Sequence, residues 1–328
     1  MKLKIGPISD LEKLRHLLKT TGMSRSELAR TLEVSYKTIY RWLDRGAKPH
    51  PRQSRDIDGL FKEHVDLRPV VLDLSKNLKD PIRVLKEQET IRKNFFLQMT
   101  YHSNAIEGSR MSVQETEQVL EGKRVRGKEL FEMLEALNHK NALAYLLERV
   151  KPRFRIDEPF LLKLHEIVMY NFSNKLPGKY RTGYVNLTNT EKILPTAQMV
   201  PVKMHEWLKE VNRFGPDPIG KIARDHYEFE AIHPFFDGNG RVGRLIMLTQ
   251  LLSRRLPPAL IQVEDRHKYY MALGKGDMGD FKNLIQMVCE SAIKGYALLV
   301  AQGSNRRLAA LGGTEKSLRS IRRRRPNR

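Results

Sequence analysis

The stretch HPFFDGNGRVGR at residues 233–244 constrains the fold more than any other part of this 328-residue chain. Pro234 disfavours the α conformation at the preceding residue, so a helix over 219–232 is expected to end with His233 extended and accessible. Apolar residues at helical spacing resume after the loop, which predicts a second helix from Arg241 onward. Between them, DGNG predicts a turn with converging backbone N–H groups. The chain must therefore place a polar loop between two amphipathic helices.

Helical spacing of apolar residues also dominates elsewhere, including residues 11–21, 130–150 and 160–170. Alternation typical of strands is confined to about 184–202, which predicts a single hairpin. We therefore expect a mainly α fold, in which a helical domain with a small β-hairpin flap follows a small helix-turn-helix domain. The stretches 46–56 and 122–129 are rich in breakers and charge, which favours boundaries there.

The formal net charge of +21 is concentrated at the two ends of the chain. Residues 1–70 hold 15 Lys+Arg against 9 Asp+Glu, giving +6, and residues 304–328 hold 9 against 1, giving +8. Basic ends favour a polyanionic partner, although a solvated basic surface explains the tail equally well. No apolar run is long enough to span a bilayer, so we expect a cytoplasmic protein with no membrane partner. The single cysteine, Cys289, lies in an apolar helical run and is expected in the core.

Residues 23–46 have the layout of a helix-turn-helix, in which Ser24 and Ser35 can each cap a helix. The expected inward-facing residues are Leu28, Ala29, Leu32, Ile39, Trp42 and Leu43. The outward-facing candidates for DNA binding are Tyr36, Lys37, Thr38, Tyr40 and Arg41, whose hydroxyl, aromatic and basic groups suit a major groove and its phosphates.

Over about residues 9–60, this region resembles the helix-turn-helix domains of bacterial transcription regulators. One departure is Glu33, which stands where those domains often carry Gly, so a turn with φ > 0 would cost about 1 kcal/mol. A small helical bundle used for protein contact or dimerisation is the alternative interpretation.

The residue types in HPFFDGNGRVGR point to phosphate chemistry. An anion in the Gly-Asn-Gly loop would lie at the N-terminus of the following helix, where the macrodipole favours negative charge. Arg241 and Arg244 are three residues apart and can flank the same side of that site. Asp237 is a natural Mg²⁺ ligand beside a polyphosphate, and His233 can take a proton from an attacking hydroxyl. The set predicts nucleotidyl or phosphoryl transfer.

The same stretch resembles the Fic-family signature, HPF-x-[DE]-GNGR-x-x-R, at every defined position, and the similarity extends over about residues 85–300. The resemblance implies a helical domain with a hairpin flap that transfers AMP from ATP to a protein hydroxyl. The implied roles are His233 as general base, Asp237 as Mg²⁺ ligand, Gly238, Asn239 and Gly240 as the anion hole, and Arg241 and Arg244 on the β- and γ-phosphates. Gly240 also favours AMP transfer, because the kinase branch of the family has Lys there.

The resemblance further implies that a flap at about 186–201 aligns the target segment by strand addition. Tyr269 and Tyr270 resemble residues that line the adenine pocket, and a pair of half-buried helix aromatics is the alternative. Asp277 is a departure, because relatives that transfer AMP often have an adenine-binding Asn at that position. A carboxylate can accept but not donate a hydrogen bond, so the preference for adenine is left open.

A second motif precedes the first by more than a hundred residues. Ile91, Phe95, Met99, His102 and Ile106 recur at helical spacing, and Gly108 is placed to end that helix. The sequence SNAIEG resembles the family's inhibitory motif, [ST]-x-x-x-E-[GN], at Ser103, Glu107 and Gly108. The resemblance implies that Glu107 forms a bidentate pair with Arg244 in the place of the γ-phosphate, while the Ser103 hydroxyl holds the helix.

The sequence thus predicts an autoinhibited protein adenylyltransferase that uses ATP and Mg²⁺, modifies itself and a target protein, and is associated with DNA. The alternatives are a transcription regulator whose Fic domain senses nucleotide, and a Fic enzyme that transfers another nucleotidyl group or removes AMP. Self-association is left open. The predicted boundaries are 1–65 for the helix-turn-helix domain, 80–122 for the inhibitory region, 123–303 for the catalytic core and 304–328 for a basic, disordered tail.

Overall fold

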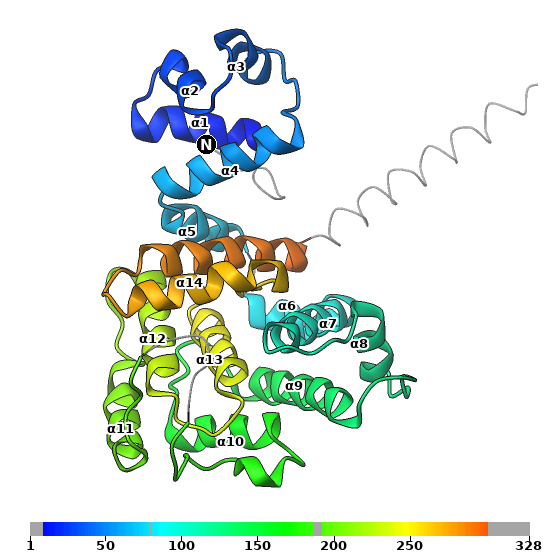
Figure 1. Ribbon diagram of the computed structural model, residues 1–328. Coiled ribbons are helices and arrows are strands. Elements are labelled where there is room, and N and C mark those ends of the chain that lie inside the picture. The colour runs from blue at the N-terminus through cyan, green and yellow to red at the C-terminus, as the bar shows by residue number, and fades with distance from the viewer. Residues whose placement is uncertain (1–8, 79, 186–191, 301–328) are drawn as a thin grey trace, which may run out of the picture. The chain divides into compact units, whose positions relative to one another are not determined.

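The computed structural model describes residues 9–78, 80–185 and 192–300, and within these ranges all regular elements are helices (Figure 1). The mainly α class predicted from the sequence is confirmed. The chain divides into two compact units, Met1–Val70 and Val71–Arg328. The tail predicted at 304–328 lies outside the described residues.

The N-terminal unit contains α1 (Asp10–Thr21), α2 (Arg25–Thr31), α3 (Tyr36–Leu43) and α4 (Pro51–His64). Ser24 and Ser35 accept backbone N–H groups at the starts of α2 and α3, so both predicted caps are confirmed. Glu33, between these helices, has a φ of 52°, so the turn adopts the positive φ that is unfavourable for a residue other than Gly. The six residues expected to face inward, Leu28, Ala29, Leu32, Ile39, Trp42 and Leu43, are all buried.

The interpretation of 46–56 as a domain boundary is wrong. α4 begins within that stretch at Pro51, because proline is well suited to the first turn of a helix, where an N–H would lack a partner. The helix packs against α1, with Lys13 Nζ 2.9 Å from Asp58 Oδ1. The breakers therefore start a helix that belongs to the N-terminal unit, and this unit ends at Val70 rather than at residue 65.

The second unit is a larger helical assembly, and α5 (Arg68–Asn77) crosses the boundary between the units. Its further α-helices are α6 (Pro81–Glu87), α7 (Glu89–Ile106), α8 (Val113–Leu120), α9 (Leu130–Arg149), α10 (Glu158–Val168), α11 (Val200–Glu210), α12 (Pro218–Ile232), α13 (Asn239–Ser253) and α14 (Arg266–Gly276). Three short 3₁₀ helices are η1 (Ser173–Lys175), η2 (Ala197–Met199) and η3 (Val263–Asp265), and residues 282–300 form a final helix.

Helix α13 is the most buried element of the second unit. All of its residues except Gly240 are buried, and α7, α9, α10 and α12 pack against it (Figure 1). The apolar side chains of these helices form one core. Because close-packed interiors deform little, the N-terminus of α13 holds the polar loop in a fixed position.

The predicted hairpin has no counterpart in the described part of its range. Residues 192–196 are irregular, η2 follows and leads directly into α11, whereas residues 186–191 lie outside the described residues. Pro195 explains why the alternating pattern failed there, because it has no N–H for a strand ladder. Pro201, in the first turn of α11, supports a helix start instead.

Two further sequence predictions are confirmed. The apolar face of α7, made of Ile91, Phe95, Met99, His102 and Ile106, is buried, and so is Cys289. Among the described residues, none of the helices is both long and apolar enough to cross a bilayer.

Candidate active site

His233 ends α12 with φ 49° and ψ 62°, which is a left-handed conformation and not the extended one predicted. Its N–H still donates to the carbonyl of Phe229, so the helix closes before the chain turns. Arg181, missed by sequence reasoning, is buried and fixes this turn, since its Nε donates to the His233 carbonyl at 2.8 Å. Burial, helped by Arg181, lowers the pKa of His233 to about 4. The imidazole is therefore neutral near pH 7 and can accept a proton.

The loop that follows is shaped by the side chain of Asn239. Its Oδ1 accepts from Phe235 N–H and its Nδ2 donates to Phe235 C=O, both at 2.9 Å. Gly238 caps α13 with a φ of 76°, a value that glycine adopts without strain. The sequence predicted that this helix begins at Arg241, but it begins at Asn239, because the two hydrogen bonds between Asn239 and Phe235 already complete the turn. The first N–H groups of a helix have no partner within it, so the N-terminus of α13, which lines the cavity described below, is suited to an anion.

Arg241 is buried beneath this loop and contacts two carboxylates. Its Nη1 lies 2.6 Å from Glu135 Oε1, and its Nη2 lies 3.1 Å from Asp237 Oδ1. Glu135, on α9, was not among the sequence candidates, because on a long amphipathic helix it resembles any other acidic residue. The pKa of Glu135 is raised by burial, against the opposing effect of Arg241.

Asp237 is the most exposed of these groups, with 42% of its side-chain surface accessible, and its Oδ2 lies 3.8 Å from Lys175 Nζ. Among the described residues, no cluster of three or more His, Cys, Asp or Glu side chains could hold a metal ion. A single accessible carboxylate still fits Mg²⁺, because this ion commonly takes one or two protein carboxylates and completes its shell with phosphates and water.

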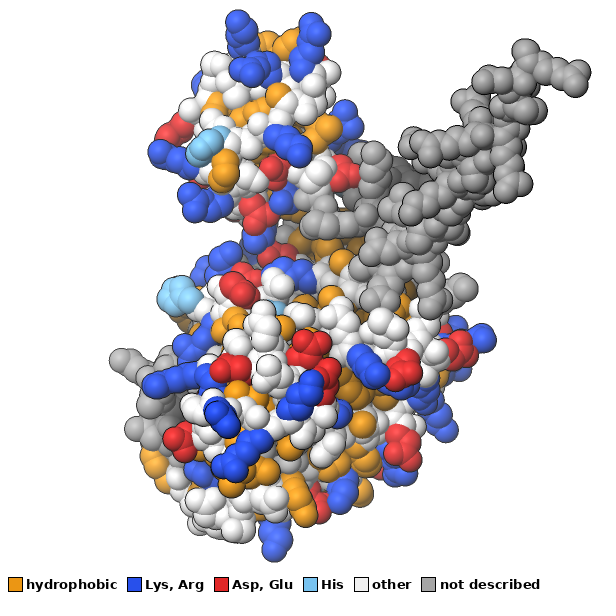
Figure 2. All heavy atoms as spheres, turned by 90° about the vertical axis from the view of Figure 1, so that its right-hand side faces the viewer, with side chains coloured by type: hydrophobic (Ala, Val, Ile, Leu, Met, Phe, Trp, Pro, Cys, Tyr) orange, Lys and Arg blue, Asp and Glu red, His pale blue; other side chains and the backbone are white. Residues whose placement is uncertain are grey.

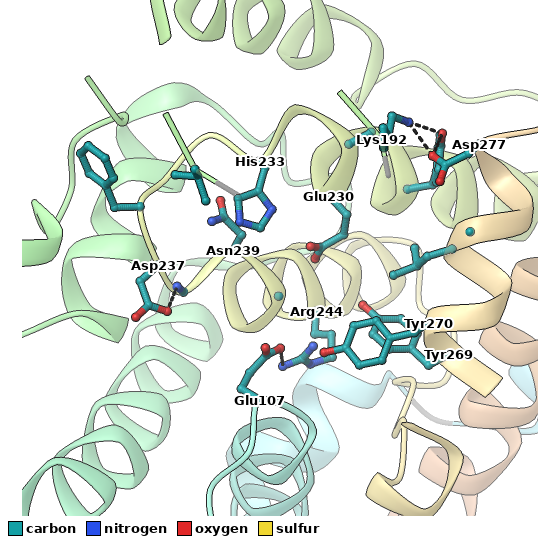
Figure 3. Close-up of a pocket in the computed structure, with 18 residues that line it drawn as sticks. Glu107, Lys192, Glu230, His233, Asp237, Asn239, Arg244, Tyr269, Tyr270 and Asp277 are labelled. Atoms are coloured by element: carbon teal, nitrogen blue, oxygen red, sulfur yellow. Dashed lines mark hydrogen bonds and ion pairs between the residues drawn. The ribbon is translucent and has the colours of Figure 1, made fainter. Parts of the chain in front are cut away.

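Arg244 is buried and connects α13 to the end of α7 (Figure 3). Its Nη2 donates to Glu107 Oε1 at 2.8 Å and to the Ser103 carbonyl at 2.8 Å, and its Nε donates to Ser103 Oγ at 3.0 Å. The expected bidentate pair with Glu107 is therefore wrong, since only Nη2 of Arg244 contacts that carboxylate. Nε contacts Ser103, and Nη1 has no hydrogen-bond partner among the described residues. Burial alone would lower the pKa of Arg244, but Glu107 raises it.

Glu107 reaches Arg244 because of two glycines. It occupies the C-terminal cap of α7, and Gly108 continues the chain with a φ of 108°. A Cβ on Gly240 would lie 2.2 Å from Glu107 Oε1, a distance at which one of the two groups would have to move. The end of α7 is also fastened by Arg266, whose Nε donates to the carbonyl of Ile106 at 2.6 Å.

These residues surround a cavity of about 320 Å³. From the sequence candidates, it is lined by Glu107, His233, Asp237, Gly238, Asn239, Gly240, Arg244, Tyr269 and Tyr270, together with Asp277. Arg241 and Ser103 do not line the cavity but contact the lining residues Asp237 and Arg244, and Gly108 directly follows the lining residue Glu107 in the chain. The structure thus brings the two motifs to one cavity, although more than a hundred residues separate them.

The aromatic wall of the cavity contains two different tyrosines. Tyr269 is 1% exposed and its hydroxyl lies 2.7 Å from His226 Nε2, whereas Tyr270 is partly buried beside it with a ring-centroid distance of 5.4 Å. At the far end, Asp277 Oδ1 accepts from Lys192 Nζ and Tyr227 Oη, each at 2.8 Å. Lys192 and Tyr227 line the cavity but carry no signal in the sequence, because their partner is distant along the chain.

The five DNA-binding candidates lie on α3, in the other unit. Tyr36, Lys37, Tyr40 and Arg41 are exposed, while Thr38 is partly buried, with its hydroxyl 2.9 Å from Ser35 Oγ. Figure 2 shows that Lys and Arg side chains are interspersed with Asp and Glu on the face of this unit that it draws.

Comparisons with known proteins agree with this site. Residues 155–251 match the Fic/DOC family model, which includes α12 and most of α13. The protein adenylyltransferase Fic of Aedes aegypti is 31% identical over 242 residues, covering 73% of this chain and 48% of the relative, and that of Nematostella vectensis is 33% identical, covering 63% and 49%. The chain spans less than half the length of these curated relatives.

Solved structures give the same fold. Fic-1 of C. elegans, residues 134–508, has a TM-score of 0.62 and 21% identity, with 92% of this chain and 90% of that chain covered. A Fic family protein of Desulfovibrio desulfuricans G20 has a TM-score of 0.60 and 25% identity, with 73% and 75% covered. From these matches and the geometry of its polar loop, residues 155–251 of this chain form a Fic domain of the Fic/DOC family.

Proposed function

We propose that this protein is an adenylyltransferase that transfers AMP from ATP to a Ser, Thr or Tyr hydroxyl of a target protein and of itself. The observation that carries the proposal is the convergence of a neutral imidazole, the free N–H groups of α13 and Arg244 on one cavity. The curated relatives named protein adenylyltransferase support the same reaction.

The reaction follows from the order of these groups around the cavity. His233 takes the proton from the target hydroxyl, whose oxygen forms a bond to the α-phosphorus while the bond to the bridging oxygen breaks and pyrophosphate leaves. The N–H groups of Asn239 and Gly240 stabilise the charge that develops on the α-phosphate. The N–H of Gly238 donates to Asp237 Oδ1 at 2.6 Å and joins them once that contact is released. Tyr269 and Tyr270 form one wall of the base pocket. The target segment would align along the residues at 186–201.

Two charged groups hold the rest of the nucleotide. Arg244 binds the γ-phosphate once Glu107 has left it, and Arg241 supports the β-phosphate. The Nε of Arg241 has no hydrogen-bond partner among the described residues, while the other two nitrogens contact Glu135 and Asp237. Mg²⁺, held through Asp237, would neutralise phosphate charge when bound.

The Glu107–Arg244 contact makes the resting protein inhibited in this proposal. A carboxylate 2.8 Å from the guanidinium occupies the place of a phosphate oxygen, and ATP binding must displace it. Ser103, with its two contacts to Arg244, keeps that guanidinium oriented toward α7. Release of this inhibition then requires a movement of the C-terminal end of α7, which carries Glu107.

A labelling experiment tests both the activity and the inhibition. The wild type, Glu107→Gly and the double variant Glu107→Gly/His233→Ala are incubated with Mg²⁺ and ATP labelled at the α-phosphate. We expect strong self-labelling of Glu107→Gly, weak labelling of the wild type and none of the double variant. Failure of Glu107→Gly to take up label would overturn the proposal. Label taken up only in a parallel incubation with ATP labelled at the γ-phosphate would point to a kinase.

Glu121→Gly is a matched control for this experiment. Glu121 caps the C-terminus of α8 with φ −84° and ψ 0°, close to the −83° and −1° of Glu107, and it lies outside the cavity lining. It should label like the wild type. Competition by other unlabelled nucleotides, and loss of label on later incubation without ATP, separate AMP transfer from transfer of another nucleotidyl group and from removal of AMP.

A second candidate function is DNA binding by the N-terminal unit, favoured by the exposed Tyr36, Lys37, Tyr40 and Arg41 on α3. The full chain should retard duplex DNA at low salt, and Lys37→Ala/Arg41→Ala should weaken this retardation. Lys19→Ala, at an exposed position on α1, is the control. Equal retardation by all three proteins would exclude α3 as the contact surface.

A further inference from the structure

Glu230 is a carboxyl group of the cavity that the proposed reaction leaves unused. It lies on α12, one turn before His233, and lines the cavity. Its Oε1 is shielded from solvent and has no hydrogen-bond partner among the described residues. An ionised oxygen that is shielded and has no partner is costly, so this environment favours the neutral carboxylic acid, and the rest of the carboxyl group remains at the cavity.

The backbone of α13 provides the space for this carboxyl group. A Cβ on Gly243 would lie 2.4 Å from Glu230 Oε1, so a larger residue there would push the carboxyl away. Gly243 directly precedes Arg244, and both Glu230 and Arg244 line the cavity. Figure 3 shows Glu230 between His233 and Arg244, at the level of the cavity.

The groups that face Glu230 come from four helices. Arg244 on α13 opposes protonation, whereas Glu107 at the end of α7 favours it. Tyr269 and Tyr270 on α14 also interact with it, and His226 on its own helix contacts the same point beside Gly243. Burial is the largest effect and raises the pKa of Glu230 to about 8. The group is therefore mostly protonated at pH 7 and carries an O–H donor.

We propose that the protonated carboxyl group of Glu230 positions the nucleotide. It would donate a hydrogen bond to a phosphate oxygen that lies between His233 and Arg244. This inference rests on the proposed function, because the ligand is the triphosphate of ATP. An ionised carboxylate at the same place would repel the phosphates, so the site needs a carboxylic acid that stays neutral at physiological pH. Glu230 thereby makes ATP binding depend on pH.

Equilibrium binding of an ATP analogue with an α,β-methylene bridge tests the inference without the chemical step. Calorimetric titrations of the full chain with Glu107→Gly, which removes the competing carboxylate, are run at fixed Mg²⁺ from pH 7 to pH 9. We expect affinity to fall by up to about tenfold over this range, because the protonated fraction of a group with a pKa near 8 falls by roughly that factor. Because Glu107 is one cause of the raised pKa of Glu230, its removal in this parent protein should lower that pKa somewhat. The fall in affinity should therefore be centred at or slightly below pH 8.

Glu230→Gln in the same background keeps an uncharged donor of the same shape, so its affinity should stay flat over the range and match the parent at pH 7. Glu230→Ala should be flat but weaker at every pH. Glu228→Gln, an exposed position on the same helix, is the matched control and should follow the parent. These variants share any titration of the nucleotide or of Mg²⁺, so only their difference reports on Glu230.

The inference is overturned by a parent whose affinity does not fall, or by a Glu230→Gln protein whose affinity falls as the parent's does. Binding with either of those profiles leaves the proposed function intact. If no protein binds the analogue at any pH, the proposed function fails, and the inference fails with it. The two failures are therefore told apart by whether binding occurs.

Discussion

Gly240 leaves the space that Glu107 fills: a Cβ at residue 240 would lie 2.2 Å from Glu107 Oε1 and 3.0 Å from Arg244 Nη1. The same glycine that belongs to the phosphate loop is thus a condition for the contact between α7 and α13. Since Gly243 does the same for Glu230, two glycines of GNGRVGR accommodate one carboxyl group each, next to the same arginine.

The first prediction concerns Gly240. Gly240→Ala should displace Glu107, because the methyl group and the carboxylate cannot share the space, while the helical backbone accepts alanine readily. In a double-mutant cycle measured by ATP-analogue affinity, Glu107→Gly should then gain much less affinity in the Gly240→Ala background than in the wild type. Gly59→Ala on α4, where the added Cβ meets nothing within 4 Å, is the control. An unchanged gain would contradict the steric relationship.

The second prediction concerns Ser103. Ser103→Ala removes the hydroxyl that accepts from Arg244 Nε, and a hydrogen bond to a buried charge contributes about 1.5–3 kcal/mol. We expect a lower melting temperature by calorimetry in the absence of nucleotide, together with increased self-labelling. Ser26→Ala, at an exposed position on α2, should change neither. Reduced stability without increased labelling would show that Ser103 supports only the fold.

The third prediction concerns Arg181. Its guanidinium donates to the carbonyls of His233, Gly183 and Pro195, so it joins the catalytic turn to the segments on either side of residues 186–191. Arg181→Ala should lower the labelling rate of Glu107→Gly by about tenfold or more, because small displacements of a general base are costly. ATP-analogue affinity should change far less. Arg213→Ala on the surface is the control, and equal losses of rate and affinity would argue against a role in positioning His233.

The fourth prediction is a pH profile of the reaction. Because burial lowers the pKa of His233 to about 4, the imidazole stays neutral down to about pH 5. The labelling rate of Glu107→Gly should therefore be level between pH 5.5 and 7 and fall as the pH approaches 4. A fall centred near 6.5, the ordinary value for histidine, would show that His233 is not buried in the active protein.

The fifth prediction is a pH dependence of stability. His139 and His226 are fully buried, and burial lowers the pKa of each to about 3. Below about pH 6.5 the unfolded chain binds protons that the folded chain does not. The free energy of unfolding therefore decreases as the pH is lowered, by up to about 1.4 kcal/mol per pH unit for each histidine. Urea unfolding of His139→Gln at pH 7, 6 and 5 should show a shallower fall than the wild type. His267→Gln, on the surface of α14, should show the same slope as the wild type.

Local rules explain the part of the fold that the sequence predicts well. Capping by Ser24 and Ser35, the buried face of α7 and the end of α12 at His233 depend on neighbours within a few residues. The left-handed backbone at His233, the start of α13 at Asn239 and the missing strand at 192–199 were mispredicted. The first depends on the hydrogen bond from Arg181 and the second on the hydrogen bonds between Asn239 and Phe235. The third depends on Pro195, which has no N–H for strand pairing.

By itself, the sequence determined which chemical groups are present and how they are spaced along each helix, because helix periodicity and capping act over one or two turns. Only the tertiary structure decided which of them meet. Glu107 and Arg244 are 137 positions apart, and Glu135 and Arg241 are 106 apart. Contacts of that kind depend on how α7, α9 and α12 pack around α13, and on glycines whose missing side chains leave room for carboxyl groups. Glu230 gains its raised pKa in the same way, from burial that no local pattern encodes.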